Sequence, residues 1–456
     1  MKNAIRLVTL LCFCLSFLPA QSGWADEPPA WRPDGPGILD LATARQIALA
    51  DNPGLAAARE RIAQAQARIK AAKSSWWPSL DLNAGGSRTR LSTNGYDQAV
   101  DLAMLSGTTA DRTQESYRAG LNATWVLFDG FRRKFSDEMA RLDEKAGISS
   151  LENSRRLLVQ AVTAAYFNAQ LATSRVTIAQ ADTDFYQDQL SEAEARHRVG
   201  SGRLSDVLNI RVRINAARAA LLTARREREA ALYGLAALMG IDNARLPEHP
   251  ELEPMDEDPK IGGECKVEEL IALALGNRPD IREAEIRLRQ LDAGLHQAKA
   301  PFYPAVVLGG GISAGPSDES SLDSDDISST VSLNLTWNLF RGGGDRARQA
   351  ELLAQKREAT YRLQDLRNTI AAEVRQAVAM VSATAEQVEL QRRTVELVGK
   401  NRDLTEQEYR AGQTTLTRLN EAQRDLITTR GRLAQALVGF RQAQLNLETV
   451  TGAPIQ

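Results

Sequence analysis

One long stretch without helix breakers limits what this chain can fold into. Residues 131–198 contain no proline and a single interior glycine, Gly147, and they follow the turn pair Asp129-Gly130. Such a segment can run as a nearly continuous helix of roughly 100 Å, at about 1.5 Å per residue. Helices of ordinary globular domains are far shorter. The sequence therefore predicts an elongated molecule.

The apolar residues of this segment follow a heptad rhythm. They recur at alternating spacings of four and three: Leu158, Val162, Ala165, Ala169, Ala172, Val176 and Ala179. This spacing is typical of a coiled-coil seam, and its small side chains allow the helices to approach closely. Residues 116–128, just before the helix, alternate between apolar and polar and predict a β-strand with one apolar face.

The same pattern of strand and long helix occurs twice. Trp125, near the end of the strand, corresponds to Trp337, which lies 212 positions later (337 − 125). A second long helix is expected over 345–410, and the glycines that follow the two helices, Gly200 and Gly412, have the same offset (412 − 200). The chain is therefore predicted to be a tandem repeat.

Prolines mark matching points near the start of each repeat. Pro53 and Pro279 differ by 226 positions (279 − 53), and Pro78 and Pro304 differ by the same number (304 − 78).

We therefore assign a first repeat to 38–240, a connector to 241–266, a second repeat to 267–452 and a tail to 453–456. The first repeat is expected to hold a helix, strands at about 79–87 and 116–128, and helices 131–198 and 204–239. The second is expected to hold a helix, strands at about 305–313 and 329–340, and helices 345–410 and 416–450. Residues 88–115 are predicted to form a long loop.

The N-terminus predicts export. Residues 1–25 place Lys2 and Arg6 before an apolar run and small residues, the pattern of a secretory signal peptide, and the proline-rich residues 26–37 predict an extended arm. Neither cysteine of the signal lies in a lipoprotein cleavage context, and the mature chain keeps only Cys265, so no internal disulfide can form. No later apolar run reaches the roughly 20 residues of a membrane helix, so a membrane-embedded part would have to consist of strands.

Four predicted strands cannot close a barrel alone, and lipid does not tolerate open strand edges. A dimer would supply eight strands and a trimer twelve, and only the larger number leaves room for a channel. Aromatic residues stand beside every strand–helix junction, as in an interfacial aromatic girdle: Trp77, Trp125, Tyr303 and Trp337. The alternative is a small sheet that covers one end of a helical bundle.

These motifs together resemble the TolC-like outer-membrane efflux proteins, or outer membrane factors, over essentially the whole mature chain. The resemblance rests on the repeat, the matching prolines, the strand exits 127–130 and 339–342, and the hairpin tips 198–208 and 409–419. It implies a mainly α fold with a membrane β-barrel part, in which a homotrimer forms one outer-membrane barrel of twelve strands and a tapering periplasmic tunnel of twelve helices. It also implies a passive duct of a Gram-negative bacterium, without enzymatic activity or cofactor, which a periplasmic adaptor and an inner-membrane pump open.

The resemblance further implies roles for the hairpin tips. The residues expected to contact the adaptor are Arg198, Gly200, Leu204, Ser205, Arg410, Gly412, Leu416 and Thr417. Many relatives constrict the tunnel with acidic residues just after the last tip, where this chain has Arg418 and Glu421. We hypothesise that Arg418 pairs with Asp206 or Glu421 across neighbouring hairpins and holds the entrance shut. The alternative is an exposed arginine in a solvated tip.

The sequence gives little support to other chemistry. The three histidines are widely separated, which indicates no metal site, and the glycines of 341–345 lack the lysine and spacing of a phosphate loop. A net charge of −2 gives no electrostatic case for nucleic acid. An elongated periplasmic or surface coiled-coil protein without a lumen remains the alternative function. Drug efflux and type I protein secretion both remain open.

Overall fold

The computed structural model describes residues 38–244, 246, 251–254, 266–317 and 327–452. The expected signal peptide (1–25), arm (26–37) and tail (453–456), Cys265 and much of the connector lie outside these residues.

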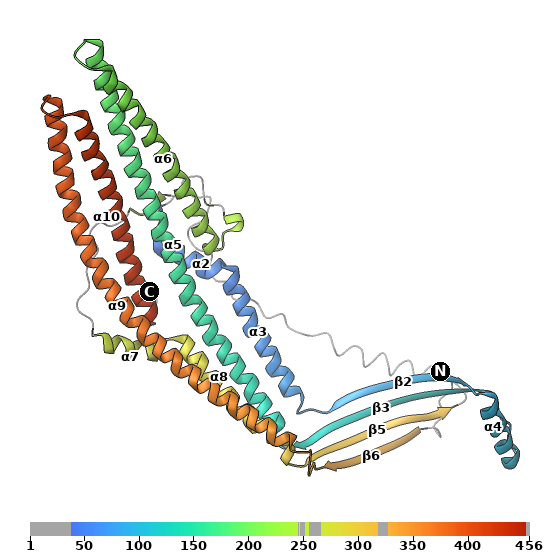
Figure 1. Ribbon diagram of the computed structural model, residues 1–456. Helices are drawn as coiled ribbons and strands as arrows, with labels where there is room; N and C mark the ends of the chain where they lie inside the picture. The colour runs from blue at the N-terminus through green and yellow to red at the C-terminus, as the bar shows by residue number, and fades with distance from the viewer. Residues whose placement is uncertain (1–37, 245, 247–250, 255–265, 318–326, 453–456) are drawn as a thin grey trace.

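The chain is long and mostly helical. The first repeat contains β1 (Ile38–Leu39), α2 (Leu41–Asp51), α3 (Pro53–Ser74), β2 (Ser79–Arg90), α4 (Thr93–Ser106), β3 (Thr113–Asp129), α5 (Arg132–Arg198) and α6 (Leu204–Met239). The short elements η1 (Asp242–Ala244) and β4 (Glu251–Leu252) follow. The second repeat contains α7 (Val267–Asn277), α8 (Pro279–Gln297), η2 (Ala300–Phe302), β5 (Ala305–Ser317), β6 (Ile327–Thr336), α9 (Gly344–Arg410) and α10 (Leu416–Thr451). In Figure 1 the hairpins α5/α6 and α9/α10 lie side by side, and the sheet extends from the other end of the long helices.

In both repeats, the turn before the proline-initiated helix is hydrogen-bonded to the end of the last helix. Pro53 and Pro279 occupy the first turn of α3 and α8, where a missing N–H costs nothing. The residue before each proline bonds to the end of the last helix of its repeat: Asn52 Nδ2 donates to the carbonyl of Leu238 (2.9 Å), and Arg278 Nη1 donates to that of Val450 (3.5 Å). These two carbonyls lie 212 positions apart (450 − 238).

The core follows the long helices as a series of apolar clusters. In the first repeat, Val162 of the predicted seam is fully buried, and the hydroxyl of its neighbour Tyr166 donates to the Leu39 carbonyl at 2.8 Å. In the second repeat, Val388 packs against Leu437 and Phe440. Full burial of such side chains stabilises by about 1.5–3 kcal/mol each, so helix pairing holds this elongated shape together.

The four long strands form one antiparallel sheet in the order β2-β3-β5-β6. Leu82, Leu121 and Ile312 are register partners on one face, and all three are at least 40% exposed. The adjacent row on the other face consists of small or polar residues: Asn83, Gly120, Ser313 and Ser328. No described helix covers either face in Figure 1, so the sheet does not form the lid of a helical bundle.

No helix within the described ranges is both long and apolar enough to cross a lipid bilayer.

Two segments differ from the sequence-based expectation, and the connector adds a short strand. The predicted loop 88–115 is wrong in part, because it contains the end of β2, the start of β3 and helix α4, which Ser92 caps through the amide of Gly95 (3.2 Å). The strand predicted over 329–340 runs instead from 327 to 336, since Ala305, the first residue of β5, pairs with Thr336 and leaves no partner beyond it. In the connector, β4 pairs in parallel with β1.

Candidate functional site

The junction between β3 and α5 is held by a buried arginine. Arg133 is 7% exposed, and its Nε donates to Asp129 Oδ2 at 3.1 Å. Its two Nη atoms donate to the carbonyls of Ser75 (3.2 Å) and Leu127 (3.1 Å), and its guanidinium lies 4.5 Å from the centre of the Trp76 ring. One side chain thus ties together the end of α3, the end of β3 and the start of α5.

A glycine allows the two repeats to approach each other at the same place. Gly130 has a φ of +68°, and a Cβ built on it would lie 2.4 Å from the carbonyl oxygen of Ala300. Phe131 packs edge-on against Tyr303, with ring centres 5.7 Å apart. The Asp129-Gly130 turn of the sequence therefore sets both the bend into α5 and the contact with the second repeat.

The structure brings the four predicted interface aromatics to the junction end of the sheet. Trp77 is 76% exposed, and the other three are between 42% and 56% exposed: Trp125, Tyr303 and Trp337. The indole N–H of Trp125 donates to the carbonyl of Trp76, and that of Trp337 donates to the carbonyl of Phe302. Their role at a membrane interface stays a prediction.

At the other end of the molecule, the two hairpin tips contact each other. The Arg196 guanidinium lies 5.5 Å from the centre of the Tyr409 ring, and Arg410 Nε lies 4.0 Å from Glu192 Oε2. Gly200 and Gly412 have φ values of 77° and 74°, which explains the two glycines at the helix ends.

Most of the residues predicted to contact an adaptor are accessible. The exposed ones are Arg198, Gly200, Leu204, Ser205, Arg410, Gly412 and Thr417. Leu416 is an exception: it is 7% exposed and packs in an apolar cluster with Val207 and Ile210 of α6. The Leu416 side chain therefore supports the contact between the hairpins, and an adaptor could not reach it in this structure.

The predicted gate residues lie close to the tips, and in the described part of the chain they form no ion pairs with one another. Arg418 and Glu421 are exposed and Asp206 is half-buried. Within the described residues, Arg418 forms no ion pair, and its backbone N–H is the donor to Thr415 Oγ1 (3.4 Å). Burial and the negative charge of Asp206 raise the pKa of Tyr409. Pairing of Arg418 between subunits stays a hypothesis.

Sequence reasoning missed a buried polar contact between the hairpins. Gln423 is 3% exposed and its Nε2 donates to Asp182 Oδ1 at 2.8 Å, which joins α10 to α5. Burial raises the pKa of Asp182. A signal was available, because Gln423 stands between Leu419 and Leu426 at the spacing of four and three that defines an apolar seam.

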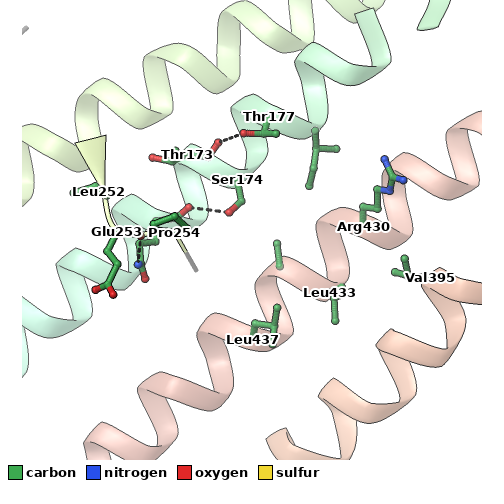
Figure 2. A pocket seen from close by; sticks show the side chains of 13 residues that line it. Thr173, Ser174, Thr177, Leu252, Glu253, Pro254, Val395, Arg430, Leu433 and Leu437 are labelled. Atoms are coloured by element: carbon green, nitrogen blue, oxygen red, sulfur yellow. Dashed lines mark hydrogen bonds between the residues drawn. The ribbon is translucent and has the colours of Figure 1, made fainter. Parts of the chain in front are cut away.

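A hollow of about 640 Å³ lies between the two hairpins (Figure 2). Its walls come from α5, α9, α10 and the end of β4, and the hydroxyls of Thr173, Ser174 and Thr177 donate to carbonyls of their own helix. Gln170 Nε2 donates to the Glu253 carbonyl at 2.7 Å. The described lining contains no nucleophile beside a base, and nowhere in the described residues do three or more His, Cys, Asp or Glu side chains gather as metal ligands would.

Comparison with known proteins first defines the class: the family model for outer membrane efflux proteins matches residues 44–241 and 270–453. The chain belongs to the outer membrane efflux protein family, which confirms the resemblance found in the sequence. It is thus an export channel component of the outer membrane.

Individual relatives cover nearly the whole chain. The pyoverdine export outer membrane protein OpmQ of Pseudomonas aeruginosa is 25% identical over 420 residues, with 91% of this chain and 85% of the relative covered. Protein CyaE of Bordetella pertussis is 28% identical over 438 residues, with 95% and 87% covered. A crystal structure of CusC superposes with a TM-score of 0.76 at 22% identity, covering 91% of this chain and 93% of that one, and so shares its fold.

Proposed function

We propose that three copies of this chain close into one channel, which spans the outer membrane as a twelve-stranded barrel and continues through the periplasm as a tunnel of helices. The observation that carries this proposal is the sheet. Its order leaves one edge each of β2 and β6 without a partner in the described chain, and its apolar face is exposed.

The exposure of that face is large. Leu82, Val331, Leu333 and Leu335 are 76%, 82%, 66% and 67% exposed. Such a surface with two open edges favours aggregation in water, and in lipid its edge amides and carbonyls would lack partners. Joining β6 of one subunit to β2 of the next would pair both edges and turn the apolar face toward lipid.

We further propose that a periplasmic adaptor and an inner-membrane pump act on the hairpin tips. The exposed residues at the tips favour a protein partner there, while the buried contacts between hairpins, such as Gln423 with Asp182, favour movement of each pair as a unit. Relatives include a pyoverdine export protein, and the family supplies passive ducts, so we assign the energy source to the pump.

The mass of the purified protein in detergent, corrected for bound detergent, tests the assembly. We expect three chains per particle, and loss of this state when charged residues replace Leu333 and Leu335 of β6. A single chain per particle would contradict the proposal. A trimer that forms no conducting pore would instead favour a coiled-coil structural protein.

A further inference from the structure

The polar face of the sheet carries two ionisable side chains between the pairs Ser79–Thr124 and Thr89–Gln114, within the described residues. They are Asp81, which pairs with Asn122, and Arg118, which pairs with Gly85. The rest of this stretch of the face in β2 and β3 is uncharged: Asn83, Gly85, Ser87, Ser116, Gly120 and Asn122.

Arg118 stands in open space. It is exposed and lines a hollow of about 970 Å³ on this face, together with Ser87, Ser116 and Gly120. Within the described chain it forms no ion pair, in contrast to Arg88 on the opposite face, whose Nε lies 3.4 Å from Glu115 Oε1. Beside Arg118 the pairing of β3 with β5 is irregular, because two steps along β3, from Tyr117 to Ala119, oppose three steps along β5.

We propose that Arg118 is a selectivity residue of the channel: three copies form a cationic ring in the barrel lumen that favours anionic solutes, those carrying carboxylate, sulfate or phosphate groups. This inference rests on the proposed closed trimer. A guanidinium keeps its charge at all physiological pH values, and a channel wall of low dielectric focuses its field. The small residues around it leave the lumen open at this level.

Asp81 does not cancel this charge. It lies four residues from Gly85 along β2 (85 − 81), or about 13 Å at about 3.3 Å per residue. The Debye length is about 8 Å at physiological ionic strength, so the two charges are largely screened from each other. An anion entering from the tunnel passes the Asp81 level first and then reaches a separate, attractive level at Arg118.

The local potential can be measured with a cysteine introduced in place of Asn83, which neighbours Arg118 on the same face. In the full chain with Cys265→Ser and Asn83→Cys, two thiol reagents of equal size, one a sulfonate and one an ammonium, are added from outside. We expect Arg118→Gln to lower the ratio of anionic to cationic reaction rates by roughly three- to tenfold in 0.1 M salt. The effect should vanish in 1 M salt, where the Debye length is about 3 Å.

Arg90→Gln is the matched control, because Arg90 has the same charge on the same pair of strands but the other face. It should leave the ratio unchanged. An unchanged ratio in Arg118→Gln, an equal fall in Arg90→Gln, or an introduced thiol that neither reagent reaches would each overturn the inference. If trimers form and conduct while the ratio is unchanged, only this inference fails; if no trimer forms, the proposed function fails as well.

Discussion

The indole N–H of Trp125 donates to the main-chain carbonyl of Trp76 at 3.1 Å. The second repeat makes the same bond from Trp337 to Phe302 at 3.2 Å, with each acceptor two residues before a proline. Trp125→Phe keeps an aromatic ring but removes the donor, so we expect a loss of about 0.5–1.5 kcal/mol in the free energy of unfolding. Trp77→Phe is the control, since Trp77 is 76% exposed. Equal unfolding curves for both variants would show that the bond contributes nothing.

Arg133 should matter far more than its neighbour Arg132. Replacing Arg133 with alanine removes the guanidinium from Asp129 and from two carbonyls, and only the backbone N–H of residue 133 still donates to Asp129 Oδ2. Removal of one partner from a buried ion pair costs about 3–5 kcal/mol. Arg132 is exposed, and Arg132→Ala should change stability by less than about 0.5 kcal/mol. Thermal unfolding of the two variants followed by circular dichroism measures the contrast. Similar midpoints would contradict the assigned role of Arg133.

Two glycines, Gly234 inside α6 and Gly240 just after its last residue, should respond to alanine in opposite directions. Gly240 ends the helix with a φ of +78°, and an added Cβ would lie 2.6 Å from the Asp51 carbonyl oxygen. Gly240→Ala should therefore cost at least about 1–2 kcal/mol from the backbone alone. Gly234 lies within the helix with no atom within 4 Å of the added Cβ, so Gly234→Ala should stabilise by about 0.5–1 kcal/mol. Denaturant unfolding of both variants tests the close contact between the end of α6 and the turn that joins α2 to α3.

The buried carboxyl group of Asp182 should make the stability of the folded chain depend on pH. Burial raises its pKa, so above the unfolded value near 3.8 the folded chain retains a proton that the unfolded chain has lost. This contribution to stability is present at low pH and is lost as the pH rises through the raised pKa. Asp182→Asn keeps the acceptor for Gln423 without a charge and should remove this slope while raising stability at pH 7. The difference in unfolding midpoint between wild type and variant, measured from pH 4 to 7, checks the sign. A difference that does not change with pH would contradict it.

The gate hypothesis predicts that Arg418→Glu and Asp206→Lys each raise the open probability of the channel, because they break a charge pair between neighbouring hairpins. Arg432→Glu is the control: it lies 14 residues further along α10 (432 − 418), on the same side of the helix but away from the tip, and is exposed. Single-channel recordings and antibiotic uptake by cells report the result. If both tip variants match wild type, Arg418 is simply a solvated residue.

Much of the fold could be predicted because its patterns are long. A segment without proline over 131–198 fixed the expectation for α5, which begins at Arg132 and ends at Arg198, and alternation indicated the apolar face that Leu82 and Leu121 share. Local composition did not predict the structure correctly where the pairing of strands determines it. The residues after Thr336 alternate like a strand, yet β5 offers them no partner, and α4 was missed because a polar stretch with Gly95 resembles a loop.

The candidate site was harder to predict, because its contacts join distant segments. The roles of Arg133 and of Asp182 with Gln423 depend on how α3, α5 and α10 pack, and no spacing in the sequence measures that. The contact between the two hairpin tips was equally hidden from the sequence. Leu416 was expected to meet a partner, but it faces its own α6 because the two hairpins lie against each other.

The central claim is that the exposed sheet closes into a conducting barrel between subunits. Single-channel conductance of the purified protein in a planar lipid bilayer tests it most directly. We predict discrete current steps, with larger or longer openings when Arg418→Glu loosens the tips. If neither the wild type nor Arg418→Glu passes current, whether the trimer inserts into the bilayer or fails to insert, the claim is contradicted.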